Sequence, residues 1–430
     1  MERLALASNP TLVQAGANIE DARGRAVQSG LYPNPTVGYN GEQMGLRGDA
    51  GPGEQQGAFI DQTIVTAGKL RLNRDKFGQE ITQMEWEAAS QRYRVVNGVR
   101  VRYYRLLAMR QQIAVREEFV RIAEDIVTTV EELVNVGQAN KPDLLQARIE
   151  ARQARVGLQN ARTLEQSARQ QLAAYIGVPQ FPDGKLAGDL ERGDPLPDYQ
   201  TSLAHLISAT PELQIARIEV ARNAIALKRE QVEPVPNVQL RASTGYNFES
   251  NTVTTTANVG LRLPVFDRNQ GNIRSATAQL ARAEADVGRV ELSLQRRLAR
   301  SYARYQTARA SVETYKAGNL PDAREAFTLY KESFEKRRAA YPQMLIAQRN
   351  YFQIASEYVE ALEQLRRSEV EIQGLLLVDG TDPPQGPGGE GRFRRREGDG
   401  ANPSDLPDPI PANGRSIEDR VGNQPGEGGS

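Results

Sequence analysis

Residues 237–263 read NVQLRASTGYNFESNTVTTTANVGLRL. Polar residues alternate with mostly apolar ones from 237 to 248 and again from 252 to 263, on either side of a turn near Glu249 to Asn251. Because successive side chains of a β-strand point to opposite faces, this alternation predicts a β-hairpin over residues 236–263 with one apolar and one polar face. The polar face is predicted to carry Asn237, Gln239, Arg241, Asn258 and Arg262.

This hairpin lies in the second copy of an internal duplication. Asn9-Pro10-Thr11-Leu12 is echoed 201 residues later by Thr210-Pro211-Glu212-Leu213, and an ordered series of further matches keeps nearly the same offset. Such a series predicts two structural repeats, residues 1–200 and 201–378, each with a helix, a β-hairpin, a very long helix and a returning helix. After the first helix, the expected ranges are about 35–65, 69–136 and 142–176 in the first repeat, which ends in a linker, and 236–263, 272–337 and 342–378 in the second.

The long helices are indicated by the near absence of proline. Residues 69–136 contain none, and residues 272–337 contain only Pro321. At ~1.5 Å per residue, each helix would be ~100 Å long. Apolar residues between 280 and 315 recur with a mean spacing of 3.5, which is typical of a coiled coil. The predicted fold class is therefore mainly α with β, built from a duplicated helix, hairpin, long helix and helix unit.

The composition excludes several kinds of function. The 430 residues include 54 basic and 54 acidic side chains, one histidine and no cysteine. This balance argues against a nucleic-acid-binding protein, because such proteins concentrate basic residues. Without cysteine, and with His205 alone, we expect no metal site and no cofactor. We find no set of nucleophile, base and acid that would indicate an enzyme, and no run of 18 apolar residues that would suit a membrane-spanning helix.

The two ends of the sequence carry separate expectations. Residues 1–7 are too few to hold the basic, apolar and cleavage regions of a secretory signal, so an exported protein would have its true start upstream. Residues 379–430 are rich in glycine, proline and charge. Such a composition buries too little apolar surface to offset the entropy of ordering, and we expect a disordered tail.

The two predicted hairpins cannot form a membrane barrel alone. Strands of about a dozen residues with a full apolar face suit a tilted membrane strand, but two hairpins give four strands and the smallest common membrane barrel has about eight. An open sheet in lipid would leave unpaired backbone groups along its edges. Closure therefore requires several copies of the chain, of which two would supply eight strands and three would supply twelve.

The long helices are polar on most faces and about three times longer than the ~30 Å hydrocarbon core of a bilayer, so we expect them to project into water. Helices from several copies, joined by their coiled-coil stripes, could enclose a tube that continues the barrel. In that arrangement the polar hairpin face lines the barrel lumen, and an ordinary solvated sheet face is the alternative. For the whole chain, a soluble coiled-coil scaffold is the alternative of another class.

Several motifs together resemble those of the TolC family of outer-membrane efflux factors, over residues 4 to about 378. The segment Leu263-Pro264-Val265-Phe266-Asp267 and the residues up to Ile273 resemble a branch of this family called CzcC-like, which serves cobalt, zinc and cadmium efflux. The other motifs are Asn9-Pro10-x-Leu12-x-x-Ala15, Gln62-x-Ile64 before Gly68-Lys69, Val136-Gly137 before Pro142-Asp143-Leu144-Leu145, Leu172-x-x-x-Ile176-Gly177 and Leu320-Pro321-x-Ala323.

The resemblance implies a homotrimer in the outer membrane, with a 12-stranded barrel in lipid and an α-helical tunnel across the periplasm. It implies a passive exit duct for metal ions or small toxic compounds, joined by a periplasmic adaptor to an inner-membrane pump of the RND type. An outer-membrane component of type I protein secretion is the alternative within the same fold.

The family's helical turns are the tips that meet the adaptor. Val136, Gly137 and Gln138 match the first tip motif, whereas Lys336 and Arg337 stand where the second tip often has a small residue and glycine. Acidic residues on the second returning helix can form a selectivity ring in this family. The corresponding positions here are Gln343 and Ile346, and we therefore expect no acidic ring from this motif.

Overall fold

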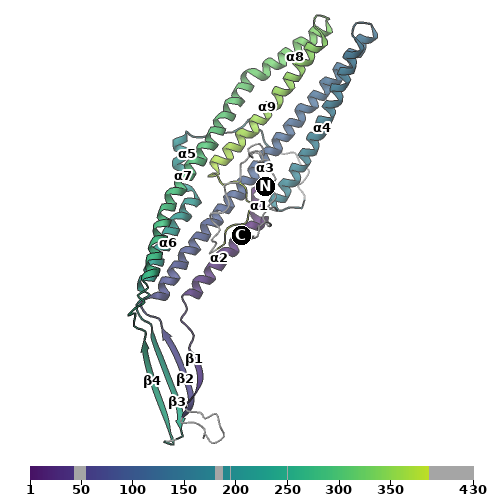
Figure 1. The fold of residues 1–430 in the computed structure, drawn as a ribbon. Coiled ribbons are helices and arrows are strands. Elements are labelled where there is room, and N and C mark those ends of the chain that lie inside the picture. Colours follow the sequence, from purple (N-terminus) through teal and green to yellow (C-terminus); the bar gives the residue numbers. More distant parts are fainter. Residues whose placement is uncertain (43–54, 180–186, 194, 249, 387–430) are drawn as a thin grey trace, which may run out of the picture. The chain divides into compact units, whose positions relative to one another are not determined.

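The fold consists of two successive runs of the same elements, with one π-helical turn added in the second (Figure 1). The computed structural model describes residues 1–42, 55–179, 187–193, 195–248 and 250–386, which lie within one unit, Met1–Pro387. The first run comprises α1 (Glu2–Ser8), α2 (Pro10–Ser29), β1 (Thr36–Glu42), β2 (Gln55–Ile64), α3 (Lys69–Asn135) and α4 (Lys141–Ile176). The second comprises α5 (Tyr199–Ala209), α6 (Pro211–Val232), β3 (Val238–Asn247), β4 (Thr252–Leu261), α7 (Gln270–Thr314), η1 (Tyr315–Asn319), α8 (Leu320–Glu335) and α9 (Tyr341–Gln373).

The predicted first helix of each repeat is preceded by a short helix that the sequence did not indicate. α1 and α5 have 7 and 11 residues, which is too short for a clear periodic signal. Pro10 and Pro211 then begin α2 and α6, because a missing N–H is tolerated at the first helical position. Asn9 caps α2 by accepting a 2.9 Å hydrogen bond from the backbone N–H of Thr11. His205, expected to precede the helices of the second repeat, is an exposed residue of α5.

The second long helix is not continuous α-helix as predicted. α7 ends at Thr314, and the π-helical turn η1 separates it from α8. Pro321 lies in the first turn of α8, where it has no N–H to donate to the carbonyl four residues earlier and its ring would crowd that carbonyl. A wider π turn just before the proline relieves both problems and lets the helix resume.

A single four-stranded antiparallel sheet is formed by the two hairpins in the order β1-β2-β3-β4. Its central pair, β2 and β3, joins the two repeats, with Ile64 opposite Val238 and Gln55 opposite Asn247. β2, Gln55–Ile64, falls within the range of about 35–65 predicted for the first hairpin. Residues 43–54 of that predicted hairpin, Glu249 of the predicted turn and residues 387–430 of the predicted tail lie outside the described residues.

The hydrophobic core lies among the helices and not under the sheet. Its largest cluster includes Leu213, Leu294, Leu298 and Leu365, all at most 6% exposed, and further clusters follow the helices toward their far ends. Within the described residues, no strand side chain belongs to these clusters. The helices therefore fold around their own core, while the sheet leaves its faces for other contacts.

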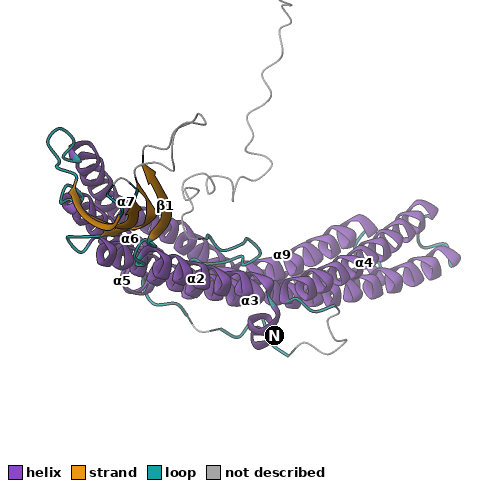
Figure 2. Ribbon diagram, turned by 90° about the horizontal axis from the view of Figure 1, so that it is seen from below, coloured by secondary structure: helices purple, strands orange, loops and turns teal. Residues whose placement is uncertain are grey.

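The sheet and the helical turns lie at opposite ends of the long helices (Figures 1 and 2). α3 leaves the sheet at Lys69 and reverses into α4 after residue 135, and α8 reverses into α9 after residue 335. Of the helices described, none is both long enough and apolar enough to cross a membrane.

Candidate functional site

One face of the sheet is mostly apolar, with Gln62 near one end, and it is open to solvent in the single chain. The register places Leu240 opposite Val259, and Ile60 opposite both Val37 and Ala242. Val37, Val259 and Val253 remain 73%, 72% and 71% exposed. Monomeric soluble proteins rarely expose a contiguous apolar surface of this kind. The face is therefore a contact surface rather than part of a buried core.

The opposite face is polar and contains three of the five predicted residues. Gln239, Arg241 and Asn258 lie within β3 and β4 on this face, with Arg241 directly opposite Asn258. Arg262 follows the end of β4 and is exposed. Asn237 precedes β3, and its side chain is instead engaged at the junction between sheet and helices, where its Oδ1 accepts a hydrogen bond.

Arg241 is the centre of a contact group on the polar face that the sequence did not reveal. On its other side it lies opposite Asp61 of β2, and its guanidinium carbon is 4.2 Å from the ring centroid of Phe59. This is a cation–π geometry. The Phe59 ring covers Gly38, where a Cβ atom would lie 2.6 Å from the ring. A cation, an anion and an aromatic ring thus meet on a face otherwise rich in Thr, Asn, Ser and Gly.

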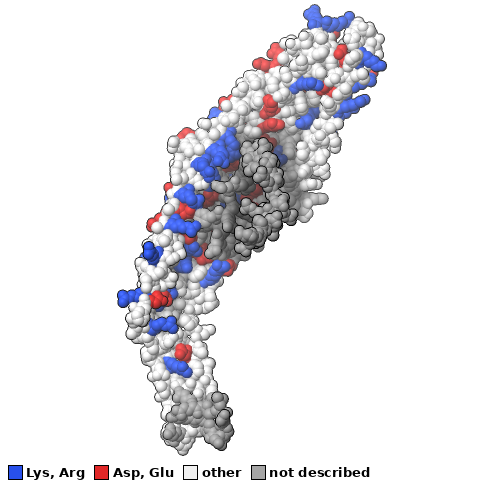
Figure 3. All heavy atoms as spheres, in the orientation of Figure 1, with Lys and Arg blue, Asp and Glu red and all other residues white. Residues whose placement is uncertain are grey.

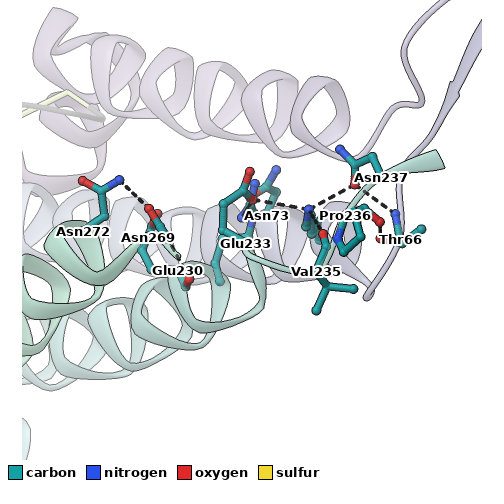
Figure 4. Close-up of polar contacts among 11 residues, drawn as sticks. Thr66, Asn73, Glu230, Glu233, Val235, Pro236, Asn237, Asn269 and Asn272 are labelled. Atoms are coloured by element: carbon teal, nitrogen blue, oxygen red, sulfur yellow. Dashed lines mark hydrogen bonds and ion pairs between the residues drawn. The ribbon is translucent and has the colours of Figure 1, made fainter. Parts of the chain in front are cut away.

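The junction between sheet and helices is held by a buried lysine, whose partners Val235, Asn237 and Glu233 are labelled in Figure 4. Lys69, the first residue of α3, is 3% exposed. Its Nζ donates to the carbonyl of Val235 at 2.6 Å and to Oδ1 of Asn237 at 3.0 Å, and it lies 3.7 Å from Oε2 of Glu233. The hydroxyl of Thr66 donates to the carbonyl of Pro236 at 2.7 Å. These contacts join the end of the first hairpin to the start of the second.

The second repeat makes its own junction with asparagines. Asn269 precedes α7 with a left-handed backbone, φ +59°, as Gly68 precedes α3 with φ +66°. The amide of Asn269 donates to the backbone carbonyl and to Oε2 of Glu230 at 2.9 and 2.7 Å, and Asn272 donates to Oδ1 of Asn269 at 2.6 Å (Figure 4). Both repeats therefore turn from strand to helix through left-handed backbone, Ala67 and Gly68 in the first and Asn269 in the second, which positions the sheet on the helices.

At the other end, the two helical turns have the same backbone hydrogen bonds. In the first, the N–H groups of Gln138 and Ala139 donate to the carbonyl of Leu133 at 2.7 and 3.1 Å. In the second, those of Arg338 and Ala339 donate to the carbonyl of Ser333 at 2.7 and 3.2 Å. This pattern belongs to a helix end closed by a left-handed residue.

The residues at the apex of both helical turns are exposed. Val136 is 63% exposed, and Gly137 and Gln138 are also exposed. Lys336 and Arg337 are exposed in the second turn, where the side chain of Lys336 lies 3.2 Å from Glu332. The two predicted tip motifs therefore occupy equivalent places with different side chains.

An open groove lies between α8 and α9 next to the second turn. It has a volume of about 520 Å³ and is lined by Asp322, Tyr330, Gln343, Ile346 and Asn350, among others. Gln343 and Ile346, the residues at the position of the family's acidic ring, thus face this groove. Within the described residues, no group of three or more His, Asp or Glu side chains is arranged to hold a metal ion.

Comparison with known proteins assigns the fold to a family. A family model described as outer membrane efflux protein matches residues 3–178 and 204–376. The chain belongs to this family. The resemblance to TolC-type efflux factors is thereby confirmed, and the two matched segments correspond to the two runs of elements.

This efflux-family protein is similar over most of its length to proteins of metal resistance. It is 27% identical to the cobalt-zinc-cadmium resistance protein CzcC of Cupriavidus metallidurans over 87% of this chain and 88% of that protein. It is 26% identical to the nickel-cobalt-cadmium resistance protein NccC of Alcaligenes xylosoxydans xylosoxydans over 69% and 67%. Among solved structures, CusC has a TM-score of 0.75 at 16% identity, covering 88% of this chain and 91% of that chain. VceC of Vibrio cholerae has 0.71 at 18%, covering 88% and 95%.

Proposed function

We propose that this efflux-family protein is the passive outer-membrane exit duct of a tripartite metal-efflux system. One observation carries the proposal: a sheet with a mostly apolar face and a polar opposite face stands outside the hydrophobic core. The apolar face can contact lipid, and the polar face can be solvated by a water-filled lumen. Pumping requires a separate energy source, because we find no nucleotide-binding motif in the sequence.

Three copies complete the barrel. In the described residues, β1 pairs only with β2 and β4 only with β3, so one edge of each outer strand is unpaired. Pairing of β4 with β1 of a neighbouring copy gives twelve strands in a homotrimer and removes every edge from lipid. α4 supports association of copies, since its Leu145, Ile149, Val156 and Leu164 are 45–60% exposed. In the barrel, Gln239, Arg241, Asn258 and Arg262 face the lumen together with Asp61.

The partners follow from the two ends of the helices. The turns at residues 136–138 and 336–338 lie far from the sheet and meet a periplasmic adaptor, which links the duct to an inner-membrane pump of the RND type. Cobalt, zinc or cadmium ions are the proposed cargo, which rests on the similarity to CzcC and NccC. The groove between α8 and α9 offers the adaptor a surface beside the second turn.

Fractionation and mass measurement test the duct itself. The protein should sediment with outer membranes, require detergent for extraction, and have the mass of three chains by light scattering. In a planar bilayer it should conduct ions. A protein that stays soluble in plain buffer as a single chain contradicts the proposal, because its exposed apolar face would then have no partner.

Cargo and partners require a cellular test. Deletion of the gene should lower tolerance to cobalt, zinc and cadmium salts, and accumulation of the metals in the periplasm should rise. Purification of the native protein after mild cross-linking should bring down one adaptor and one inner-membrane transporter. Unchanged metal tolerance, together with loss of export of a secreted polypeptide, would instead assign the duct to protein secretion.

A further inference from the structure

The two helical turns have equivalent geometry but opposite charge. Matching segments, residues 131–143 and 331–343, are separated by 200 residues, and each contains the end of one helix, the turn and the start of the next. The first carries Glu131, Glu132 and Asp143 against Lys141, a net charge of −2. The second carries Lys331, Lys336, Arg337 and Arg338 against Glu332 and Glu335, a net charge of +2.

The apex of the second turn is the cationic part. Lys336, Arg337 and Arg338 are consecutive and exposed, and basic side chains gather at this end of α8 and α9 in Figure 3. Lys336 has an ion pair with Glu332 across one helical turn. Within the part of the chain that the structure describes, Arg337 and Arg338 have no ion pair. Their charge is therefore free for whatever meets the end of the helices.

The apex of the first turn is neutral. Val136, Gly137 and Gln138 form it, and the three acidic residues of that end lie on the flanking helices and not in the turn. A partner that approaches along the axes of the helices would meet the apex of each turn. The cations are thus placed for an axial partner.

Folding alone does not explain the arginine at the apex. Arg337 has a φ of +62°, in the left-handed region where a side chain is strained and glycine is not. The first turn shows that Val-Gly-Gln forms the same hydrogen bonds with a glycine at this position. A contact that uses the guanidinium would offset the strain, since exposed cations bind carboxylates through charge-assisted hydrogen bonds.

We propose that the Lys336–Arg338 turn is a charge-selective contact that receives a carboxylate-bearing segment of the periplasmic adaptor. The Val136–Gln138 turn makes an uncharged contact with the same kind of partner. This inference rests on the proposed function, in which an adaptor docks at this end. It follows that the two turns are not interchangeable, and that the charge pattern fixes the position in which each adaptor docks.

The test exchanges the apex and keeps its backbone. In the full chain, Lys336→Val, Arg337→Gly and Arg338→Gln give the second turn the sequence of the first, whose hydrogen bonds are the same, so the variant should fold. The captured adaptor should bind about tenfold more weakly at low salt, and the difference should shrink toward 1 M salt, where the Debye length is only ~3 Å. The matched control, Lys228→Gln, removes an exposed cation of α6 near the sheet and should change binding less than about twofold.

A second measurement identifies what the turn touches. A photo-cross-linking residue at position 338 should capture an adaptor peptide that contains Asp or Glu, and one at position 138 should capture a different peptide. Replacing the captured carboxylates by lysine should weaken binding to the unmodified chain. The same replacement should restore binding to the variant with Lys336→Glu and Arg338→Glu.

The outcomes separate the two levels of the proposal. In one outcome, the adaptor cross-links at both turns while neither salt nor the exchanged apex alters its binding. That result overturns the charge-selective contact and leaves the duct in place. No adaptor at either turn overturns both. Two further results, each obtained while adaptor binding is unchanged, also reject the adaptor contact. If the variant floats less with phosphatidylglycerol vesicles, the cations contact lipid. If its trimer is less stable to heat, the cations contact a neighbouring copy.

Discussion

Gly137 and Arg337 hold the same left-handed position in two helical turns with matching hydrogen bonds, with φ of +74° and +62°. Replacement of Arg337 by glycine should therefore raise the free energy of unfolding by about 1 kcal/mol, because relief of strain exceeds the extra freedom of glycine in the unfolded chain. Gly137→Ala should lower it by about 1 kcal/mol, although a Cβ atom there would meet nothing within 4 Å. Denaturant unfolding followed by circular dichroism measures both changes.

Gly78 provides the control for these substitutions. It lies inside α3 with an ordinary helical backbone, and a Cβ atom at this position would also meet nothing within 4 Å. Gly78→Ala should raise stability by up to about 1 kcal/mol, as expected in a helix interior. If alanine has the same effect at Gly78 and Gly137, backbone strain is not what distinguishes the turn.

Lys69 is expected to be essential for the junction between sheet and helices. Lys69→Met keeps the length of the side chain but removes the buried donor of the Val235 carbonyl, and leaves Oδ1 of Asn237 with only the N–H of Thr66. Loss of one partner of buried hydrogen bonds costs about 2–3 kcal/mol, so hydrogen exchange should accelerate at the start of α3 and of β3. Lys228→Met on α6, where the lysine is exposed, should stay within about 0.5 kcal/mol of the unmodified protein. Equal effects of the two changes would show that the buried contacts carry no special weight.

Much of the fold was predictable because periodicity reports directly on the faces of strands and helices. The hairpin expected at 236–263 is present as β3 and β4, Val238–Leu261, and α3 begins at the expected Lys69. Pro10 and Pro211 marked the starts of α2 and α6 correctly, but the helices before them were missed, since a start signal does not show what precedes it. The π-helical turn η1 between α7 and α8 was not predicted, because the sequence does not show how the backbone before Pro321 adapts to the proline.

The candidate site was less predictable, because periodicity assigns a residue to a face and not to a neighbour. Gln239, Arg241 and Asn258 were placed on the polar face, but Asp61 and Phe59 approach Arg241 only through the pairing of β2 with β3. Alternation of Phe59, Asp61 and Thr63 in the first hairpin was the available signal. For Asn237, alternation indicated the polar face, whereas its contact with Lys69 depends on tertiary structure.

Tyr341 should make stability fall at alkaline pH. Burial, followed by the nearby charges of Glu150 and Asp143, raises the pKa of its phenol to about 12, while Arg349, which is paired with Glu150, opposes the shift. An unfolded tyrosine titrates near 10. Between about pH 10 and 12 the folded state keeps a proton that the unfolded state loses, so stability present below pH 10 declines as the pH rises, by up to about 3 kcal/mol.

Tyr341→Phe removes this titration. Urea unfolding of the variant should show a smaller decline between about pH 10 and 12 than the unmodified protein, whereas both should vary similarly with pH below about 9. Parallel curves over the whole range would show that the buried phenol does not contribute to the alkaline loss. The comparison is best made on the detergent-solubilised assembly, because Tyr341 lies in the helical end, near the second turn.

The two faces of β4 should respond oppositely to the same substitution. Val259 lies on the apolar face and is 72% exposed in the single chain, and the adjacent Asn258 lies on the polar face. If the apolar face contacts lipid, Val259→Lys places a charge in the hydrocarbon region at a cost of about 2–4 kcal/mol near the midplane, and the amount of heat-resistant trimer in outer membranes should fall. Asn258→Lys adds the same charge to the lumen, where water solvates it, and should leave trimer assembly intact while changing ion selectivity in planar bilayers. Equal assembly of both variants would mean that lipid does not distinguish the faces, and the assignment of inside and outside would have to be abandoned.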